Sequence, residues 1–303
     1  MKDSEDAEPR GRLPNRARRY FLLAVAGSAT AALLGAATRL PEFILFRQRL
    51  FFSISAPGEN VTLYPFDQET HDGLTLRSWY NPAENGKPTI VYFAGRDGDL
   101  LRKPAHLYRL AEEGYGLLLV GYRGYGGNPG YPSERNMFLD ASSLLAQAQD
   151  KGIAPNGYVI YGYSMGTAIA ANAAAQVRPR GLILEAPISR FIEAVRQQAA
   201  FVPSWLVRTR FDNRSRLAEL DMPVLLLAGG RDAVTPPGFA RSLASVNQRH
   251  ATVRIFDDAN HFSIIRLGGG DAVRDFVDQL LDEEEENVPQ MQDVRSEQEP
   301  DRS

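Results

Sequence analysis

The central part of the chain alternates between short apolar runs and longer stretches with helical spacing. Six of the runs are continuously apolar, and an earlier pair flanks Asp72-Gly73, a turn signal typical of a β-hairpin. Continuous apolar strands separated by helices indicate a mostly parallel sheet covered on both faces, and thus one α/β domain. The expected strands are 61–66, 74–80, 89–93, 116–122, 159–162, 181–185, 224–228 and 253–256, and the expected helices include 104–113, 137–149 and 165–177.

A different pattern precedes this domain. Residues 20–38 carry no charge, are rich in alanine and follow Arg18 and Arg19. Their length is close to the ~20 residues that an apolar helix needs to cross a bilayer. We favour a transmembrane anchor over a signal peptide cleaved near Gly35-Ala36-Ala37, an export signal of the twin-arginine type, or an ordinary buried helix. In the membrane interpretations the basic residues 1–19 stay in the cytoplasm and the domain is extracytoplasmic.

The other end of the chain is strongly acidic. Residues 282–303 hold nine acidic and two basic side chains, whereas the whole chain has a net charge of -3. Like charges repel, and this segment has almost no large apolar residue to bury, so we predict a disordered tail. The domain itself is then expected at 39–281, with a possible small cap at about 187–217, where apolar residues and arginines form a stretch longer than a simple connection.

Composition excludes several classes of function. None of the 303 residues is cysteine, which rules out disulfides, cysteine-based zinc sites and a thiol nucleophile. A domain that is nearly neutral gives no basis for nucleic-acid binding.

The strongest local signal is the sequence Gly-Tyr-Ser-Met-Gly at 162–166, between an apolar strand and an alanine-rich helix. Glycines on both sides of Ser164 allow a sharp turn from strand to helix that exposes the hydroxyl at the carboxyl edge of the sheet. The amide of Met165 begins the helix and can donate to a developing oxyanion. In this context Ser164 is a candidate nucleophile, although the pattern alone is also compatible with a plain turn.

A serine nucleophile needs a base, and the base needs an orienting carboxylate. When the serine lies on such a strand-to-helix turn, the acid and then the histidine should follow it along the chain, each after a strand. Asp232 follows the strand that ends at residue 228, and His261 follows the strand that ends at residue 256. The other three histidines lie in a turn, in a helix and at a helix end. Glu185, which also ends a strand, is the alternative acid.

Ser164, Asp232 and His261 resemble the triad of the α/β-hydrolase superfamily. More narrowly, Tyr-Arg-Gly-Tyr-Gly at 122–126, Gly-Tyr-Pro-Ser-Glu at 130–134 and the following Asp140-Ala141 are similar to the membrane-anchored serine hydrolases of the ABHD13, ABHD17 and Bem46 type. The resemblance covers roughly residues 40–281. It implies an α/β-hydrolase fold, and it strengthens the anchor interpretation because an apolar N-terminal anchor is usual in that group.

The chain departs from this group in two places. The loop that usually reads His-Gly-Asn-x-Gly-Asn and supplies an oxyanion amide is Ala-Gly-Arg-Asp-Gly-Asp at 94–99 here. An amide donor at Gly95 or Arg96 is still expected, and the Arg96 guanidinium could pair either with an anionic substrate group or with a neighbouring aspartate. The second departure is Gly121, where the group usually has aspartate.

These residues predict a serine hydrolase that cleaves carboxylic esters or thioesters and needs no metal or organic cofactor. Its expected partners are a small-molecule or lipid-like acyl substrate and a membrane. Two alternatives remain open at this point: a serine peptidase that uses the same triad, and a membrane-tethered binding protein that has lost catalysis.

Overall fold

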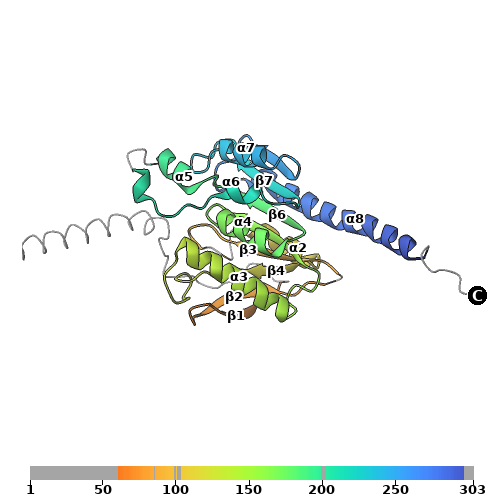
Figure 1. Ribbon diagram of the computed structural model, residues 1–303. Coiled ribbons are helices and arrows are strands. Elements are labelled where there is room, and N and C mark those ends of the chain that lie inside the picture. Colours follow the sequence, from red (N-terminus) through yellow and green to blue (C-terminus); the bar gives the residue numbers. More distant parts are fainter. Residues whose placement is uncertain (1–60, 85, 99, 101–103, 199–202, 297–303) are drawn as a thin grey trace, which may run out of the picture.

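The computed structural model describes residues 61–84, 86–98, 100, 104–198 and 203–296. A sheet of eight strands in the order β1-β2-β4-β3-β5-β6-β7-β8 forms the centre (Figure 1). From β4 to β8 all neighbours are parallel, whereas β1 and β2 pair antiparallel and β2 joins β4 antiparallel. The strands are β1 Tyr64–Glu69, β2 Thr75–Asn81, β3 Thr89–Phe93, β4 Gly116–Leu119, β5 Tyr158–Tyr163, β6 Gly181–Glu185, β7 Val224–Gly229 and β8 Ala251–Phe256.

The first strand lies three residues later than the apolar pattern predicts. Phe66 and Gln68 are the buried positions of β1, and they pair with Ser78 and Leu76 of β2. A polar residue takes an inward position here because the Gln68 side chain donates to the backbone carbonyl of Asp140 at 3.2 Å. The alternation of inward and outward positions therefore continues past the apolar run.

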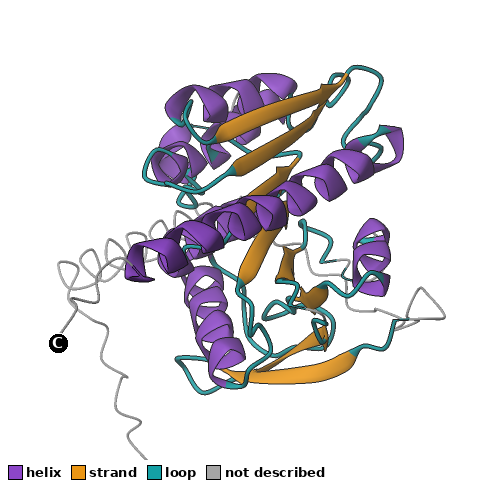
Figure 2. Ribbon diagram, turned by 90° about the vertical axis from the view of Figure 1, so that its right-hand side faces the viewer, coloured by secondary structure: helices purple, strands orange, loops and turns teal. Residues whose placement is uncertain are grey.

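The helices cover both faces of the sheet. Strands β5, β6, β7 and β8 follow one another in one direction across the sheet, so right-handed crossovers place their connecting helices on one face. The step from β3 to β4 runs in the opposite direction, which places α2 on the other face. Figure 1 shows α3, α4 and α6 on the near face, and in Figure 2 the long helix α8 crosses in front of the sheet. The helices are α2 Ala105–Glu112, α3 Glu134–Asp150, α4 Gly166–Val177, α5 Phe191–Gln198, α6 Asn213–Leu217, α7 Pro237–Val246 and α8 Gly269–Ser296, with short 3-10 turns η1 Ser204–Leu206 and η2 Ile265–Leu267.

Helix α8 continues into the acidic segment for which we expected disorder from residue 282 onwards. Its first half is amphipathic, with Val273, Val277 and Leu280 buried against the body. Glutamate is a good helix former, so a helix anchored by this apolar side can run on through the acidic residues as far as Ser296. Residues 297–303 lie outside the described residues.

The predicted anchor, residues 20–38, also lies outside the described residues. Within the ranges that the structure describes, no helix combines the length and the apolar character needed to cross a bilayer. The membrane prediction therefore rests on the sequence.

Candidate active site

Ser164 lies on a sharp turn between β5 and α4. Its φ of +52° falls in the left-handed region, which non-glycine residues rarely adopt. The two flanking glycines make this turn possible by close approach. A Cβ atom at Gly162 would lie 2.7 Å from Ala170, and one at Gly166 would lie 2.1 Å from the carbonyl oxygen of Phe93. No other residue type fits these two positions without displacing the backbone, which explains the Gly-x-Ser-x-Gly spacing.

The structure brings together the three residues that the sequence analysis selected. The Nε2 atom of His261 lies 3.0 Å from the Oγ atom of Ser164, and the Nδ1 atom lies 2.8 Å from the Oδ2 atom of Asp232. His261 and Asp232 are buried, while Ser164 is half-buried. Each residue follows the carboxyl end of a different parallel strand, so the sheet sets their spacing. A proton donor, a base and an orienting carboxylate therefore form one hydrogen-bonded row.

The carboxylate of Asp232 is held by more than the histidine. Its Oδ1 atom accepts the backbone N–H groups of Val234 and Thr235 at 2.7 and 2.8 Å, and its Oδ2 atom accepts the Thr235 hydroxyl at 2.8 Å. Burial by itself raises the pKa of Asp232, but the hydrogen bond and charge of His261 and the bonds from Thr235 outweigh burial and keep this pKa below its usual range. Asp232 is thus held in the ionised form that orients a histidine.

Glu185, the alternative acid, is engaged elsewhere. Its carboxylate accepts the hydroxyl of Tyr161 at 2.7 Å, deep in the sheet, and its backbone carbonyl accepts the N–H of Ser164 at 2.9 Å. Burial raises the pKa of Tyr161, and the negative charge of Glu185 raises it further. Glu185 therefore supports the turn that carries Ser164, whereas His261 pairs with Asp232.

Two backbone segments lie beside Ser164: the start of α4 and the loop after β3. Met165 caps the N-terminus of α4, and its N–H has no acceptor among the described residues. A Cβ atom at Gly95 would lie 3.4 Å from the Cβ atom of Ser164, so the loop after β3 runs directly beside the nucleophile. This loop is fixed at its start, because the Tyr122 hydroxyl donates to the carbonyl of Ala94 at 2.8 Å. The amides of Gly95 and Arg96 are the donors that we selected here from the sequence.

Gly121 departs from the family pattern for a steric reason. A Cβ atom at this position would lie 1.9 Å from the carbonyl oxygen of Arg77 on β2. The N–H of Gly121 donates to the Ser78 hydroxyl at 2.9 Å, which draws the two segments together. An aspartate cannot occupy this position unless β2 moves away.

The Tyr-Arg-Gly-Tyr-Gly motif contributes a buried arginine that holds two loops together. The Arg123 side chain is 2% exposed and forms hydrogen-bonded ion pairs with Asp140 at 2.6 Å and with Asp72 at 2.9 Å. The hydrogen bonds from Arg123 lower the pKa of Asp72, and those with Asp140 raise the pKa of Arg123. This network fixes the segment that presents Tyr122 to the loop beside Ser164.

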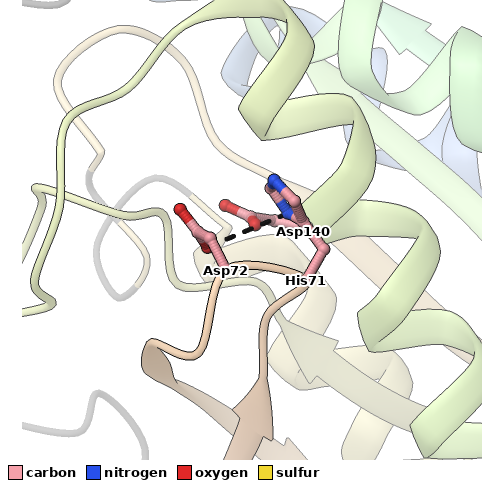
Figure 3. Close-up of side chains that lie close together, drawn as sticks. All are labelled: His71, Asp72 and Asp140. Atoms are coloured by element: carbon pink, nitrogen blue, oxygen red, sulfur yellow. Dashed lines mark ion pairs between the residues drawn. The ribbon is translucent and has the colours of Figure 1, made fainter.

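His71, Asp72 and Asp140 have ligand atoms within 4.8 Å of one another, a spacing that could suit a metal ion (Figure 3). The guanidinium of Arg123, however, donates to both oxygens of each carboxylate. These oxygens already have a cationic partner, and a metal ion beside Arg123 would be repelled by it. We therefore interpret the cluster as a structural ion-pair network.

The stretch expected as a small cap is attached to the body through Phe211. The Phe211 side chain is fully buried, and its ring lies 5.8 Å from that of Phe138 on α3 and 6.2 Å from that of Phe191 on α5. The carboxylate of Glu134 accepts the backbone N–H groups of Arg210 and Phe211 at 2.7 and 2.9 Å. The Pro-Ser-Glu motif thus links α3 to this stretch, a role that the motif did not reveal in the sequence.

Two further side chains beside the triad were missed by the sequence analysis. The hydroxyl of Thr235 lies 3.2 Å from the Nδ1 atom of His261 as well as bonding Asp232, and the Tyr163 hydroxyl donates to the carbonyl oxygen of His261 at 3.0 Å. Tyr163 stood inside the Gly-x-Ser-x-Gly motif and Thr235 stood three residues after Asp232. Both positions were visible, but only the folded chain shows that they contact the histidine.

Comparison with known proteins agrees with this fold. The family model described as "Serine aminopeptidase, S33" matches residues 84–215. The chain is 29% identical over 232 residues to Uncharacterized protein Rv2307c of Mycobacterium tuberculosis, covering 74% of this chain and 81% of that protein. It is 28% identical over 201 residues to Protein bem46 of Schizosaccharomyces pombe, covering 61% of this chain and 66% of that protein.

A third relative and a solved structure extend the comparison. Lysophosphatidylserine lipase ABHD12 of Danio rerio is 30% identical over 183 residues, covering 52% of this chain and 47% of that protein. The Pyrococcus furiosus esterase Pf2001 superposes with a TM-score of 0.64 at 17% sequence identity, covering 77% of this chain and 97% of that chain. The likeness to the Pyrococcus furiosus esterase, at 17% identity, is a likeness of fold. Taken with the sheet order and the family match, these relatives establish the chain as an enzyme of the α/β-hydrolase superfamily that resembles the Bem46-like proteins.

Proposed function

We propose that this α/β-hydrolase cleaves carboxylic ester or thioester bonds through Ser164, His261 and Asp232 by way of an acyl-enzyme. The observation that carries the proposal is a chain of two hydrogen bonds. The Oγ atom of Ser164 lies 3.0 Å from the Nε2 atom of His261, and the Nδ1 atom of His261 lies 2.8 Å from the Oδ2 atom of Asp232. The name of one relative, a lipase, and that of the superposed structure, an esterase, agree with an ester substrate.

In the first half of the reaction His261 acts as the base. Its Nε2 atom accepts the hydroxyl proton of Ser164 while the Oγ atom forms a bond to the acyl carbon and the carbonyl electron pair moves onto oxygen. Asp232 accepts the Nδ1–H group, which orients the ring and stabilises the imidazolium. The amides of Met165 and of Gly95 or Arg96 donate to the oxyanion. The intermediate then expels the alkoxide or thiolate, which takes the proton from Nε2.

In the second half, water replaces the leaving group. The Nε2 atom accepts a proton from water as its oxygen adds to the acyl carbon, and the same proton passes to Ser164 Oγ when the acyl bond breaks. The products are a carboxylic acid and the free enzyme. Every proton moves between Ser164, His261, water and the leaving group, so these steps need no metal or organic cofactor.

The loop beside Ser164 was the only sequence argument for a non-catalytic binding protein. Its polar side chains differ from the family pattern, but its backbone still passes beside the nucleophile with amides that have no acceptor among the described residues. Oxyanion stabilisation by this loop depends on the backbone amides, which the side-chain differences leave in place.

Steady-state kinetics on the full chain test this proposal. A series of p-nitrophenyl esters from acetate to palmitate should be hydrolysed, and Ser164→Ala should reduce kcat by a factor of about 10³ or more. Ser245→Ala is the matched control, since Ser245 is an exposed serine on α7 whose hydroxyl donates to a carbonyl of its own helix. Ester hydrolysis that survives Ser164→Ala unchanged would refute the proposal.

A serine peptidase is the second candidate, favoured by the description of the matching family as a serine aminopeptidase. The same triad serves both reactions, so the pocket and the leaving group decide between them. Aminoacyl p-nitroanilides assayed beside the esters separate the two: a peptidase gives the higher kcat/KM with the anilides, and both activities fall together in Ser164→Ala.

Attachment to a membrane through residues 20–38, with the domain on the extracytoplasmic side, stays part of the proposal on sequence grounds. Carbonate extraction of cell membranes tests it. An anchored chain remains in the membrane pellet, and a chain that is cleaved near residue 37 or never inserted is released.

A further inference from the structure

Arg96 belongs to the loop after β3 that runs beside Ser164. The N–H of Gly98 donates to the carbonyl of Gly95 at 2.9 Å, which closes a β-turn with Arg96 and Asp97 as its two central residues. Gly95 is the residue whose added Cβ atom would lie 3.4 Å from that of Ser164. The exposed Arg96 is therefore the second residue of a turn whose first residue lies beside the nucleophile.

The guanidinium of Arg96 has no ion pair or hydrogen bond with any residue that the structure describes. Other arginines on the surface do: Arg77 pairs with Asp67, and Arg231 pairs with Asp258, both at 2.7 Å. Arg231, which directly precedes Asp232, is therefore paired, whereas Arg96 has no partner among the described residues. An unpaired guanidinium beside a nucleophile is available to a ligand.

A buried aromatic side chain supports the turn. The Tyr125 ring packs beneath the turn, where a Cβ atom at Gly98 would lie 2.6 Å from it. Its hydroxyl is buried and has no hydrogen-bond partner among the residues that the structure describes. Burial raises the pKa of Tyr125, the charge of Arg96 lowers it and that of Asp97 raises it, so both charges act at this hydroxyl. Asp97 is half-buried, and its charge also raises the pKa of Tyr122 and Tyr163.

We propose that Arg96 is a specificity residue that binds an anionic group of the substrate, so that the preferred esters carry a carboxylate or a phosphate near the scissile carbonyl. This inference rests on the proposed ester hydrolysis and names its substrate class. A guanidinium donates two parallel N–H bonds to a carboxylate or phosphate, which binds such a group and also orients it.

The test compares charged with neutral esters on the full chain. One arm places the charge on the acyl side: p-nitrophenyl half-esters of succinate and glutarate against their methyl-capped counterparts. The other arm places it on the leaving group: a monoacylglycerol phosphate against the matching monoacylglycerol. The readout is the ratio of kcat/KM for the charged to the neutral member. A general loss of activity through the oxyanion loop lowers both members and cancels in this ratio.

The parent should prefer the charged member in at least one arm, and Arg96→Gln should lower that ratio by about tenfold or more, because hydrogen bonds to charged groups are among the stronger ones. Arg96→Lys should retain part of the preference. Arg249→Gln is the matched control. Arg249 is also exposed and has no ion pair within the described ranges, but it precedes the amino end of β8, whereas the site lies at the carboxyl ends of the strands, so the ratio should not change.

A parent ratio near one in both arms, or an equal ratio in the parent and Arg96→Gln, would overturn the inference while leaving ester hydrolysis intact. Absence of hydrolysis with every ester, charged and neutral, would instead overturn the proposed function and this inference with it. The arm in which the ratio falls identifies the side of the substrate that carries the anion.

Discussion

The hydroxyl of Tyr122 donates a hydrogen bond of 2.8 Å to the backbone carbonyl of Ala94, the first residue of the loop beside Ser164. Both residues are buried, so the carbonyl of Ala94 has no access to water in compensation. Tyr122 is in turn followed by Arg123, whose two ion pairs fix this part of the chain. The most recognisable motif of the family thus acts on the active site through the loop that supplies its amides.

Removing this hydroxyl tests that relationship. Tyr122→Phe should lower kcat for ester hydrolysis by about tenfold with little change in KM, because an oxyanion donor acts mainly in the transition state and a shifted loop misplaces it. Tyr115→Phe is the control. Tyr115 is equally buried and its hydroxyl also forms one hydrogen bond, to Asp278 on α8, but it lies before the amino end of β4. A similar loss of kcat in both variants would contradict a specific role of Tyr122.

The choice of acid can be tested by two amide substitutions. Asp232→Asn should lower kcat by about 10³–10⁴-fold, because an asparagine cannot stabilise the imidazolium and favours the wrong tautomer of His261. Glu185→Gln should keep an acceptor for the Tyr161 hydroxyl and reduce kcat far less. Kinetics of both variants on one ester, with circular dichroism as a check of folding, decide the matter. If Glu185→Gln were the more damaging change, the assignment of the acid would be wrong.

Stability in acid depends on the carboxylates that Arg123 binds. Hydrogen bonds from Arg123 lower the pKa of Asp72 in the folded state, so the unfolded chain binds the proton more readily. The stabilisation is complete above the ordinary aspartate pKa of about 4 and is lost as the pH falls through the lower folded value. Asp72→Asn should therefore lower the melting temperature at pH 7, and the difference from the parent should shrink between about pH 4 and pH 2.

Thermal unfolding followed across that range measures this difference. Its size at pH 7 is expected to be modest, since Asp72 is 41% exposed at the surface. A difference that stays the same at every pH would show that the ion pair is not its source.

Gly121 provides a steric test. Gly121→Ala should destabilise the fold by about 1–3 kcal/mol, because a Cβ atom there meets the Arg77 carbonyl at 1.9 Å and β2 has to move. Gly238→Ala is the control, since Gly238 lies in α7 with nothing within 4 Å of an added Cβ atom, and alanine favours a helix. Chemical denaturation measures both. A Gly121→Ala variant as stable as the parent would contradict the close contact.

Much of this arrangement could be predicted because it depends on local patterns. Apolar runs and turn signals locate most strands to within one to three residues, and Ser164, Asp232 and His261 each follow a strand end in the expected chain order. Parallel strands bring their carboxyl ends to one edge, which makes three residues distant in sequence neighbours in space. The site residues were therefore accessible to sequence reasoning.

Contacts between side chains of distant segments were not accessible. The bond from Tyr122 to Ala94, the attachment of Phe211 by Glu134 and the clash that requires Gly121 all depend on how segments pack, which no spacing along the chain encodes. The helix beyond residue 282 was missed for a related reason. Its acidic residues read as disorder by composition, whereas the buried apolar side at its start sustains a helix through them.

The central claim is that Ser164 is a nucleophile activated by His261. Its most direct test is the intact mass of the full chain after treatment with an alkyl fluorophosphonate, followed by peptide mapping. Our account predicts a single phosphonyl adduct on Ser164, lost in Ser164→Ala, strongly slowed in His261→Gln and unchanged in Ser245→Ala. A parent chain that stays unmodified while a control serine hydrolase is labelled, or an adduct on a different residue, would contradict it.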